Sequence, residues 1–196
     1  RSKQLFYKNQ AQFNSGLIAY YPINRDSSGD FKDESSYYNY AEDINEMTFS
    51  GGVSPEDGKI YKGLGFDGVD DYGTIADLSG NIPSSGTVSQ WVYADWGTIS
   101  AGKTRYFSAE DSGGNDFRFY SKDRILVDTN LGNTIDIDSP LNPTDIGWHH
   151  FVFTWDYDGT DTTGTLYVDG INGGTDTQAG LLSFDGSVTL GEWSGN

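Results

Sequence analysis

Short runs of apolar and β-branched residues, separated by clusters of turn-forming residues, run along the whole chain. The clearest alternation is Phe151-Val-Phe153-Thr-Trp155, where three aromatic side chains would share one face of a strand. Leu166-Tyr-Val168 repeats this pattern. No segment has the apolar period of a convincing helix. The pattern therefore predicts short strands that each bury one face.

These runs predict strands throughout the chain, with turn signals between them. The strands are Leu17–Tyr21, Gly63–Phe66, Tyr72–Ile75, Thr87–Tyr93, Arg105–Ser108, Phe117–Ser121, Ile125–Asp128, His149–Trp155, Thr165–Val168 and Ser187–Leu190. The turn signals include Ser50-Gly-Gly52, Asp158-Gly159, Asp169-Gly170 and Asn172-Gly-Gly174. Many short strands with Gly-rich turns predict an all-β antiparallel sandwich.

The length of the chain, 196 residues, suits one large sandwich domain. A domain of this size needs neither a disulfide nor a structural metal to fold, which agrees with the absence of Cys. Residues 1–15 differ from the rest, because they are basic and hold one apolar cluster, Leu5-Phe-Tyr7. We divide the chain into a linker or docking segment, 1–15, and a β-sandwich, 16–196. Since it begins at Arg1 and not Met, we expect a processed chain or part of a longer one.

The formal net charge of −17 narrows the range of partners. Nucleic-acid binding needs a basic footprint and is therefore not expected. No apolar run is long enough to span a bilayer, so we expect no membrane insertion. The acidity has three explanations: solubility, adaptation to a salty environment, and oxygen ligands for hard cations. We favour the first two, because Asp-Gly and Asp-Ser pairs are ordinary turn chemistry.

From Gly16 onward the order of motifs resembles the laminin-G-like jelly roll of the concanavalin A-like lectin/glucanase superfamily. The motifs, in order, are Gly16-Leu-Ile-Ala-Tyr-Tyr-Pro22, Asp33-Glu-Ser-Ser-Tyr-Tyr-Asn39, Gly63-Leu-Gly-Phe-Asp-Gly-Val-Asp-Asp-Tyr72, Thr87-Val-Ser-Gln-Trp-Val92, Gly147-Trp-His-His150 and Leu166-Tyr-Val-Asp-Gly170. The fourth resembles the family's central strand. The resemblance implies a concanavalin A-like sandwich used for adhesion or glycan binding.

The chain departs from the family pattern in two places. Ser36-Tyr37-Tyr38 replaces the glycine of an early turn. The family also continues past the strand at Val188-Thr-Leu-Gly191 into a final strand, whereas this sequence stops at Asn196. Two explanations stay open: the sequence is part of a longer chain that supplies the last strand, or the open sheet edge is filled by residues 1–15 or by a neighbouring subunit.

Calcium is the metal that the sequence favours, because it takes six to eight oxygen ligands from loops. Pentraxin-like relatives gather calcium with an Asx pair before one strand and acidic residues near the C-terminus. By that resemblance Asn115 and Asp116 would face Glu192, with Asp111 contributing from the same loop. The alternative interpretation is an ordinary polar hairpin loop beside an unrelated glutamate.

Sugar recognition needs an exposed aromatic ring beside hydrogen-bonding side chains. Trp96, Tyr120 and Trp193 fall near the ends of predicted strands or in loops, and are the candidate ligand-binding residues. Trp91 lies in the middle of a predicted strand, so we assign it to the core.

Catalytic sites are poorly supported. The two carboxylates of a glycosidase need acidic residues two or four positions apart on a strand. The segment Glu42-Asp-Ile-Asn-Glu46 has this spacing but lies in a turn-rich segment. His149 and His150 would point to opposite faces of one strand and are assigned to structural packing. The segment with Asp156, Asp158 and Asp161 has acidic residues like those of an EF-hand calcium loop, but their spacing differs and the closing Glu is missing. We predict that it is a hairpin turn.

These observations predict a non-catalytic, extracellular or surface-located module that binds a glycan or a protein surface, with calcium as a candidate cofactor. The alternative is a structural or display subunit of an extracellular filament, virion or cell-surface layer. A polysaccharide hydrolase or lyase ranks last, since it lacks an acidic pair on a predicted strand.

Overall fold

The structure is a computed structural model that describes residues 47–60, 62–66, 70–75, 83–94, 105–110, 116–120, 124–140, 145–182 and 188–191. Every regular element in these ranges is a strand. The strands are β1 (Met47–Ser50), β2 (Ser54–Asp57), β3 (Lys62–Gly65), β4 (Tyr72–Ile75), β5 (Ser85–Ala94), β6 (Arg105–Glu110), β7 (Asp116–Tyr120), β8 (Arg124–Asp128), β9 (Thr134–Asp138), β10 (Gly147–Tyr157), β11 (Asp161–Val168), β12 (Ile171–Ala179) and β13 (Val188–Leu190).

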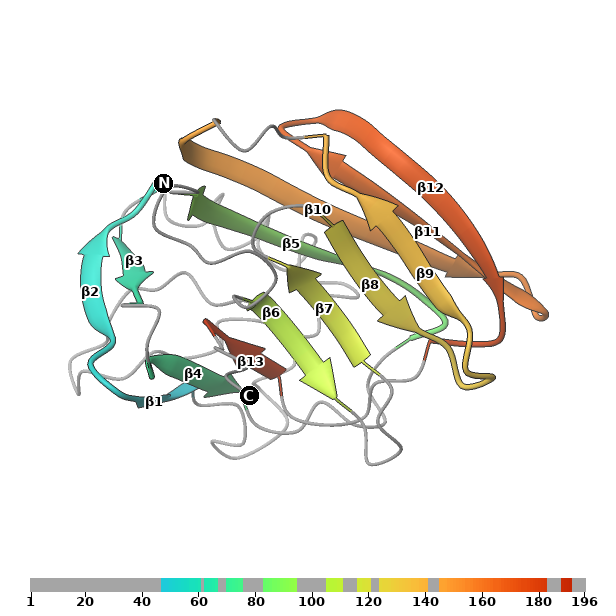
Figure 1. Cartoon of the computed structure of the whole chain (residues 1–196), viewed down its shortest axis with the longest axis horizontal. Helices are drawn as coiled ribbons and strands as arrows, with labels where there is room; N and C mark the ends of the chain where they lie inside the picture. The colour runs from blue at the N-terminus through green and yellow to red at the C-terminus, as the bar shows by residue number, and fades with distance from the viewer. Residues whose placement is uncertain are drawn as a thin grey trace, which may run out of the picture.

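Two antiparallel sheets form the layers of a sandwich (Figure 1). One has seven strands in the order β1-β4-β13-β6-β7-β8-β9, and the other has four in the order β12-β11-β10-β5. The pair β2 and β3 forms a separate hairpin beside the end of β5 and the beginning of β10. The predicted all-β antiparallel sandwich is therefore confirmed. In the described part of the chain, β5 lies at the end of its sheet and not in the centre.

The core lies between the two sheets and is rich in aromatic side chains. Phe117 and Phe119 of β7 face Phe153 of β10, with ring centroids 5.4 and 6.5 Å from it, and Trp155 lies 6.1 Å from Phe153. All four side chains are buried. Burying each side chain of this size contributes about 1.5–3 kcal/mol. The predicted shared face of Phe151, Phe153 and Trp155 is therefore confirmed.

Two glycines opposite Trp155 make room for aromatic rings of the core. In the register of the four-stranded sheet, Gly86 of β5 and Gly164 of β11 are its two cross-strand partners. A Cβ at Gly86 would lie 2.4 Å from the Trp155 ring, and one at Gly164 would lie 2.8 Å from the Phe153 ring. The indole nitrogen donates to the carbonyl of Pro83 at 3.0 Å, so its polar atom is satisfied.

The turn predictions are confirmed at two hairpins and wrong at one. Asp169 and Gly170 join β11 to β12 with φ of 51° and 79°, the left-handed pair of a type I′ turn. Asp158 closes the turn between β10 and β11 by accepting hydrogen bonds from the amides of Thr160 and Asp161. The segment 172–174 is not a turn: it lies inside β12, at the bulge where Gly173 is the extra residue opposite Leu166 and Tyr167.

Every predicted strand that falls within the described ranges is present, and four strands were missed. The missed strands are β1, β2, β9 and β12. β9 alternates buried Ile135 and Ile137 with exposed Asp residues, a strand pattern that the sequence analysis missed. β12 contains Gly, Asn and Asp, residue types that are depleted in strands, and there tertiary pairing overrode the local preference. The predicted strand Leu17–Tyr21 and the docking segment 1–15 lie outside the described residues.

Candidate functional site

Exposed aromatic rings gather on the outer face of the four-stranded sheet. In β5, Val88 and Val92 turn toward the core, so Trp91 and Tyr93 turn outward. Trp91 is 40% exposed and Tyr93 is 55% exposed. Large aromatic side chains are rarely left open to water on neighbouring positions of a strand without a functional reason. The assignment of Trp91 to the core is therefore wrong.

β10 supplies a second pair of rings that lie directly beside the first. His150 pairs with Trp91, and Trp148 pairs with Tyr93, in the register of the sheet. The His150 ring is stacked on Trp91 with centroids 4.8 Å apart and planes inclined by 22°. Trp148 meets Tyr93 edge to face at 5.6 Å and 77°. We call Trp91, Tyr93, Trp148 and His150 the aromatic patch.

Polar groups border the aromatic patch on two sides. Ser89 Oγ lies 2.9 Å from His150 Nε2, on the side toward the middle of the sheet. Lys59 Nζ lies 5.5 Å from the centre of the Trp91 ring, within cation–π distance. Lys59 belongs to the turn between β2 and β3, and Gly63 of the same hairpin lies against Trp148, since a Cβ added to it would be 3.6 Å from that ring. The patch thus combines apolar ring faces with hydrogen-bonding groups at their edges.

The opposite face of β10 anchors this end of the sheet. His149 Nδ1 lies 2.7 Å from Asp169 Oδ2, and its Nε2 lies 3.2 Å from the carbonyl of Asp145. The other carboxylate oxygen of Asp169 accepts the amide of His150 at 2.9 Å. Partial burial acts to raise the pKa of Asp169, but these hydrogen bonds and the imidazole charges outweigh burial and lower it. The two histidines point to opposite faces, as predicted, and each has a packing partner.

Of the residues predicted to bind calcium, the structure describes only Asp116. Its carboxylate is buried and paired with Arg118 of the same strand, and its amide donates to Asp128 Oδ2 at 3.1 Å. Oδ1 of Asp116 is buried and has no hydrogen-bond partner. Asp111, Asn115 and Glu192 lie outside the described residues. Within the described ranges, no three His, Cys, Asp or Glu side chains gather as metal ligands.

The predicted sugar-binding residues Trp96 and Trp193 lie outside the described residues. Tyr120 is the last residue of β7, and its side chain is likewise not described. The structure therefore tests none of them. It adds instead the aromatic patch, which the sequence analysis missed. The sequence Thr87-Val-Ser-Gln-Trp-Val92 did indicate that Trp91 points outward. Its two valines, four residues apart, share the inner face of the strand, and Trp91 falls on the other face.

β9 carries an acidic pair that the sequence analysis also missed. Asp136 and Asp138 are two residues apart, exposed and on one face of the strand. Asp136 forms an ion pair with Arg124 at 3.2 Å. The general acid of a glycosidase lies in an enclosed or apolar setting, whereas Asp136 and Asp138 are exposed on the surface of the sheet. The other acidic pair, in 42–46, lies outside the described residues.

Comparison with known proteins places the chain in a family. A laminin G family model, described as the concanavalin A-like lectin/glucanases superfamily, matches residues 67–196, and the chain therefore belongs to this superfamily. A solved structure described as "Botulinum Neurotoxin Type G Receptor Binding Domain" is similar, with a TM-score of 0.56 and 13% identity over 83% of this chain. The match covers 40% of that structure, and at this identity it shows the fold alone.

No curated protein matches the chain. The described residues contain no long apolar helix of the kind that crosses a bilayer.

Proposed function

We propose that this domain is a non-catalytic binding module that recognises a glycan through the aromatic patch. The observation that carries the proposal is the pair of exposed rings, Trp91 and Tyr93, held by their neighbours on β10. A sugar ring has C–H groups on its face and hydroxyl groups at its edge. An exposed aromatic ring with polar neighbours matches both parts of this surface.

The surroundings of the patch agree with this ligand class. Ser89, His150 and Lys59 offer hydrogen-bonding atoms around the Trp91 ring. The net charge of −17 opposes nucleic acids and other polyanions. The family is described by its lectins and glucanases, and the similar solved structure is described as a receptor-binding domain. The lectins in the family's name support a binding role, and the solved structure supports the shared fold.

Glycan-array screening followed by calorimetry tests the proposal. Trp91→Ala should abolish binding to the glycan that the wild-type domain retains, because it removes the stacking surface. Tyr72→Ala is the matched control, since Tyr72 is 41% exposed but lies on β4 of the other sheet. An equal loss of glycan affinity in both variants, or no loss of affinity in Trp91→Ala, would contradict the proposed site.

We further propose that calcium organises the loop beside β7 and that the domain works outside the cell. The buried Oδ1 of Asp116 without a hydrogen-bond partner supports a cation there. Asp111, Asn115 and Glu192 would supply further oxygens, and extracellular modules of this kind bind calcium at about 10⁻⁴–10⁻³ M. Titration of calcium into chelator-stripped protein should show a saturable site that Asn115→Ala removes. Stability that follows only ionic strength would contradict it.

A second candidate function is a structural or display subunit. The position of β5 favours this function. In the described part of the chain β5 is the end strand of the four-stranded sheet, and its ten residues include no charged residue and no proline. Such an edge can accept a strand from another chain. Light scattering across a range of protein concentrations separates the two functions, since a subunit should assemble at the concentrations where a binding module stays monomeric.

A further inference from the structure

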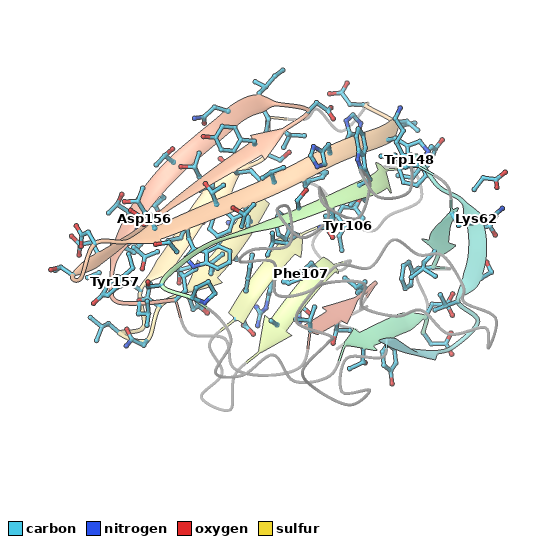
Figure 2. The ribbon with its side chains drawn as sticks, turned by 180° about the vertical axis from the view of Figure 1, so that it is seen from behind. Lys62, Tyr106, Phe107, Trp148, Asp156 and Tyr157 are labelled. Carbon is cyan, nitrogen blue, oxygen red and sulfur yellow. The ribbon has the colours of Figure 1, made fainter. Side chains whose placement is uncertain are left out.

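The aromatic patch is one end of a longer surface that crosses the outer face of the four-stranded sheet. Along β10 the outward positions are Trp148, His150, Val152, Thr154 and Asp156, because Phe151, Phe153 and Trp155 between them are buried. Trp148 and Asp156 are eight residues apart, which corresponds to about 27 Å of strand. Figure 2 shows these two residues at opposite ends of β10.

Hydroxyl groups continue the surface beyond the aromatic patch. The next row across the sheet consists of Ser89, Val152 and Tyr167, and the row after it of Thr87, Thr154, Thr165 and Thr175. Thr165 Oγ1 lies 3.0 Å from Thr175 Oγ1, and Thr163 Oγ1 lies 2.9 Å from Thr177 Oγ1. In each pair one hydroxyl donates to the other, so a second O–H and several acceptor lone pairs stay available to a ligand.

The charge of this surface is unlike that of the rest of the molecule. The strands β5, β10, β11 and β12 contain no Lys or Arg, and their acidic residues are Asp156, Asp161 and Asp176. Asp156 accepts a hydrogen bond from Ser85 at the far end of the surface, and Asp176 accepts the amide of Asp136 on β9. Lys59 borders this surface at the aromatic patch, but beyond the patch a sulfated or carboxylated chain would find no cation on these strands to neutralise it.

We infer that the ligand is an uncharged, linear glycan of several sugar units, which lies along β10, between the side chains of β5 and β11, with one end on the aromatic patch. This inference rests on the proposed function and adds the length, charge and direction of the ligand. The ring faces bind one or two sugars by stacking. The rows of serine, threonine and tyrosine hydroxyls then bind the following sugars by hydrogen bonds, which a single terminal sugar would not reach.

The test is a length series of neutral oligosaccharides measured by calorimetry. Dimers, tetramers and hexamers of β-1,4-linked glucose, β-1,3-linked glucose and β-1,4-linked mannose are compared, with chondroitin sulfate as the anionic chain. For the linkage that binds, affinity should rise about tenfold from dimer to hexamer, the scale of one or two added hydrogen bonds. Chondroitin sulfate should bind more weakly than the neutral hexamer.

Variants distinguish the two ends of the surface. Trp91→Ala should remove binding of every length, whereas Tyr167→Phe and Thr154→Val should weaken only the tetramer and hexamer. Both distal variants keep the shape of the side chain, so the fold is preserved, and Tyr72→Ala is again the control. Equal affinity for dimer and hexamer, no effect of either distal variant, or preference for chondroitin sulfate would overturn the inference.

The outcomes also separate this inference from the proposed function. If Trp91→Ala abolishes binding but affinity does not depend on length, glycan binding stands and the extended ligand is wrong. If none of the series binds and the glycan array is also blank, the proposed function fails, and the inference fails with it.

Discussion

Glycine at a few core positions determines whether the large aromatic side chains fit between the sheets. Gly86 is the clearest case, because its missing Cβ would lie 2.4 Å from Cζ2 of Trp155. Trp155 in turn packs against Phe117 and Phe153 in the centre of the sandwich. The size of one residue on β5 is therefore fixed by an indole ring on β10.

Gly86→Ala should lower the free energy of unfolding by about 1–3 kcal/mol, the usual cost of overpacking a core. Gly52→Ala is the matched control, since a Cβ there would make only an ordinary contact, 3.5 Å from Asp71 Oδ1. Urea denaturation followed by tryptophan fluorescence gives both values. Equal stability of the two variants would show that Trp155 moves aside without cost.

Asp169 contributes stability that depends on pH. The His149 hydrogen bond, the His150 amide and the imidazole charges lower its pKa below the ordinary value of 3.8, against the opposing effect of partial burial. A carboxyl whose pKa is lowered by folding stabilises the protein above its unfolded pKa, and this contribution is lost as the pH falls through the folded pKa. Asp169 therefore loses its contribution in acid, below pH 3.8.

Asp169→Asn should be less stable than the wild-type domain near neutral pH, and the difference should shrink as the pH falls below 3.8. Asparagine tolerates the left-handed backbone of this position, so the turn itself is kept. Denaturation at a series of pH values measures the difference. A difference that stays constant down to the acid limit would mean that the charge of Asp169 has no part in it.

At the scale of elements, the hairpin of β11 and β12 depends on the conformation of its two-residue turn. Gly170 has a φ of 79°, and a Cβ added to it would meet nothing within 4 Å, so only backbone strain opposes a side chain there. β12 is the other end strand of the four-stranded sheet and carries Thr175 and Thr177 of the hydroxyl rows. The turn and the bulge at Gly173 together therefore set the register of part of the proposed ligand surface.

Gly170→Ala should destabilise the domain by about 1–2 kcal/mol, the cost of a left-handed conformation for an L-residue. Gly170→Asn should cost less, because asparagine visits this region more readily. Thermal unfolding of both variants provides the comparison. If Gly170→Asn destabilised the domain as much as Gly170→Ala, backbone strain at this φ would not be the cause of the destabilisation.

At the scale of the whole molecule, the net charge of −17 produces self-repulsion that acts on the compact state. Added salt screens this repulsion, since the screening length is about 30 Å at 0.01 M and about 8 Å at 0.15 M. The melting temperature should therefore rise between these two concentrations. Sodium and potassium chloride should act equally, because screening depends on ionic strength and not on the identity of the ion.

An additional rise with calcium at matched ionic strength would belong to a specific site and not to screening. The two measurements together separate general acidity from a calcium-organised loop. A melting temperature that does not change with salt would mean that the charges lie too far apart to act on stability.

The sequence by itself determined the fold class and most of the described strands. Phe151, Phe153 and Trp155 recur at every second position, and this spacing places them on one buried face of a sheet. Asp169-Gly170 specified its own turn, because few residue pairs adopt two consecutive positive φ angles. These features are local, so they can be recognised without knowing what lies across the sheet.

Only the tertiary structure decided what the aromatic residues of β5 contact, and therefore whether they form a site. Trp91 becomes exposed because Val88 and Val92 occupy the inner face, and it becomes part of a site because the register of β10 places His150 beside it. β12 is a strand despite its Gly, Asn and Asp residues, because β11 offers a paired edge. Register and pairing join residues that are far apart in the chain, and no local pattern specifies them.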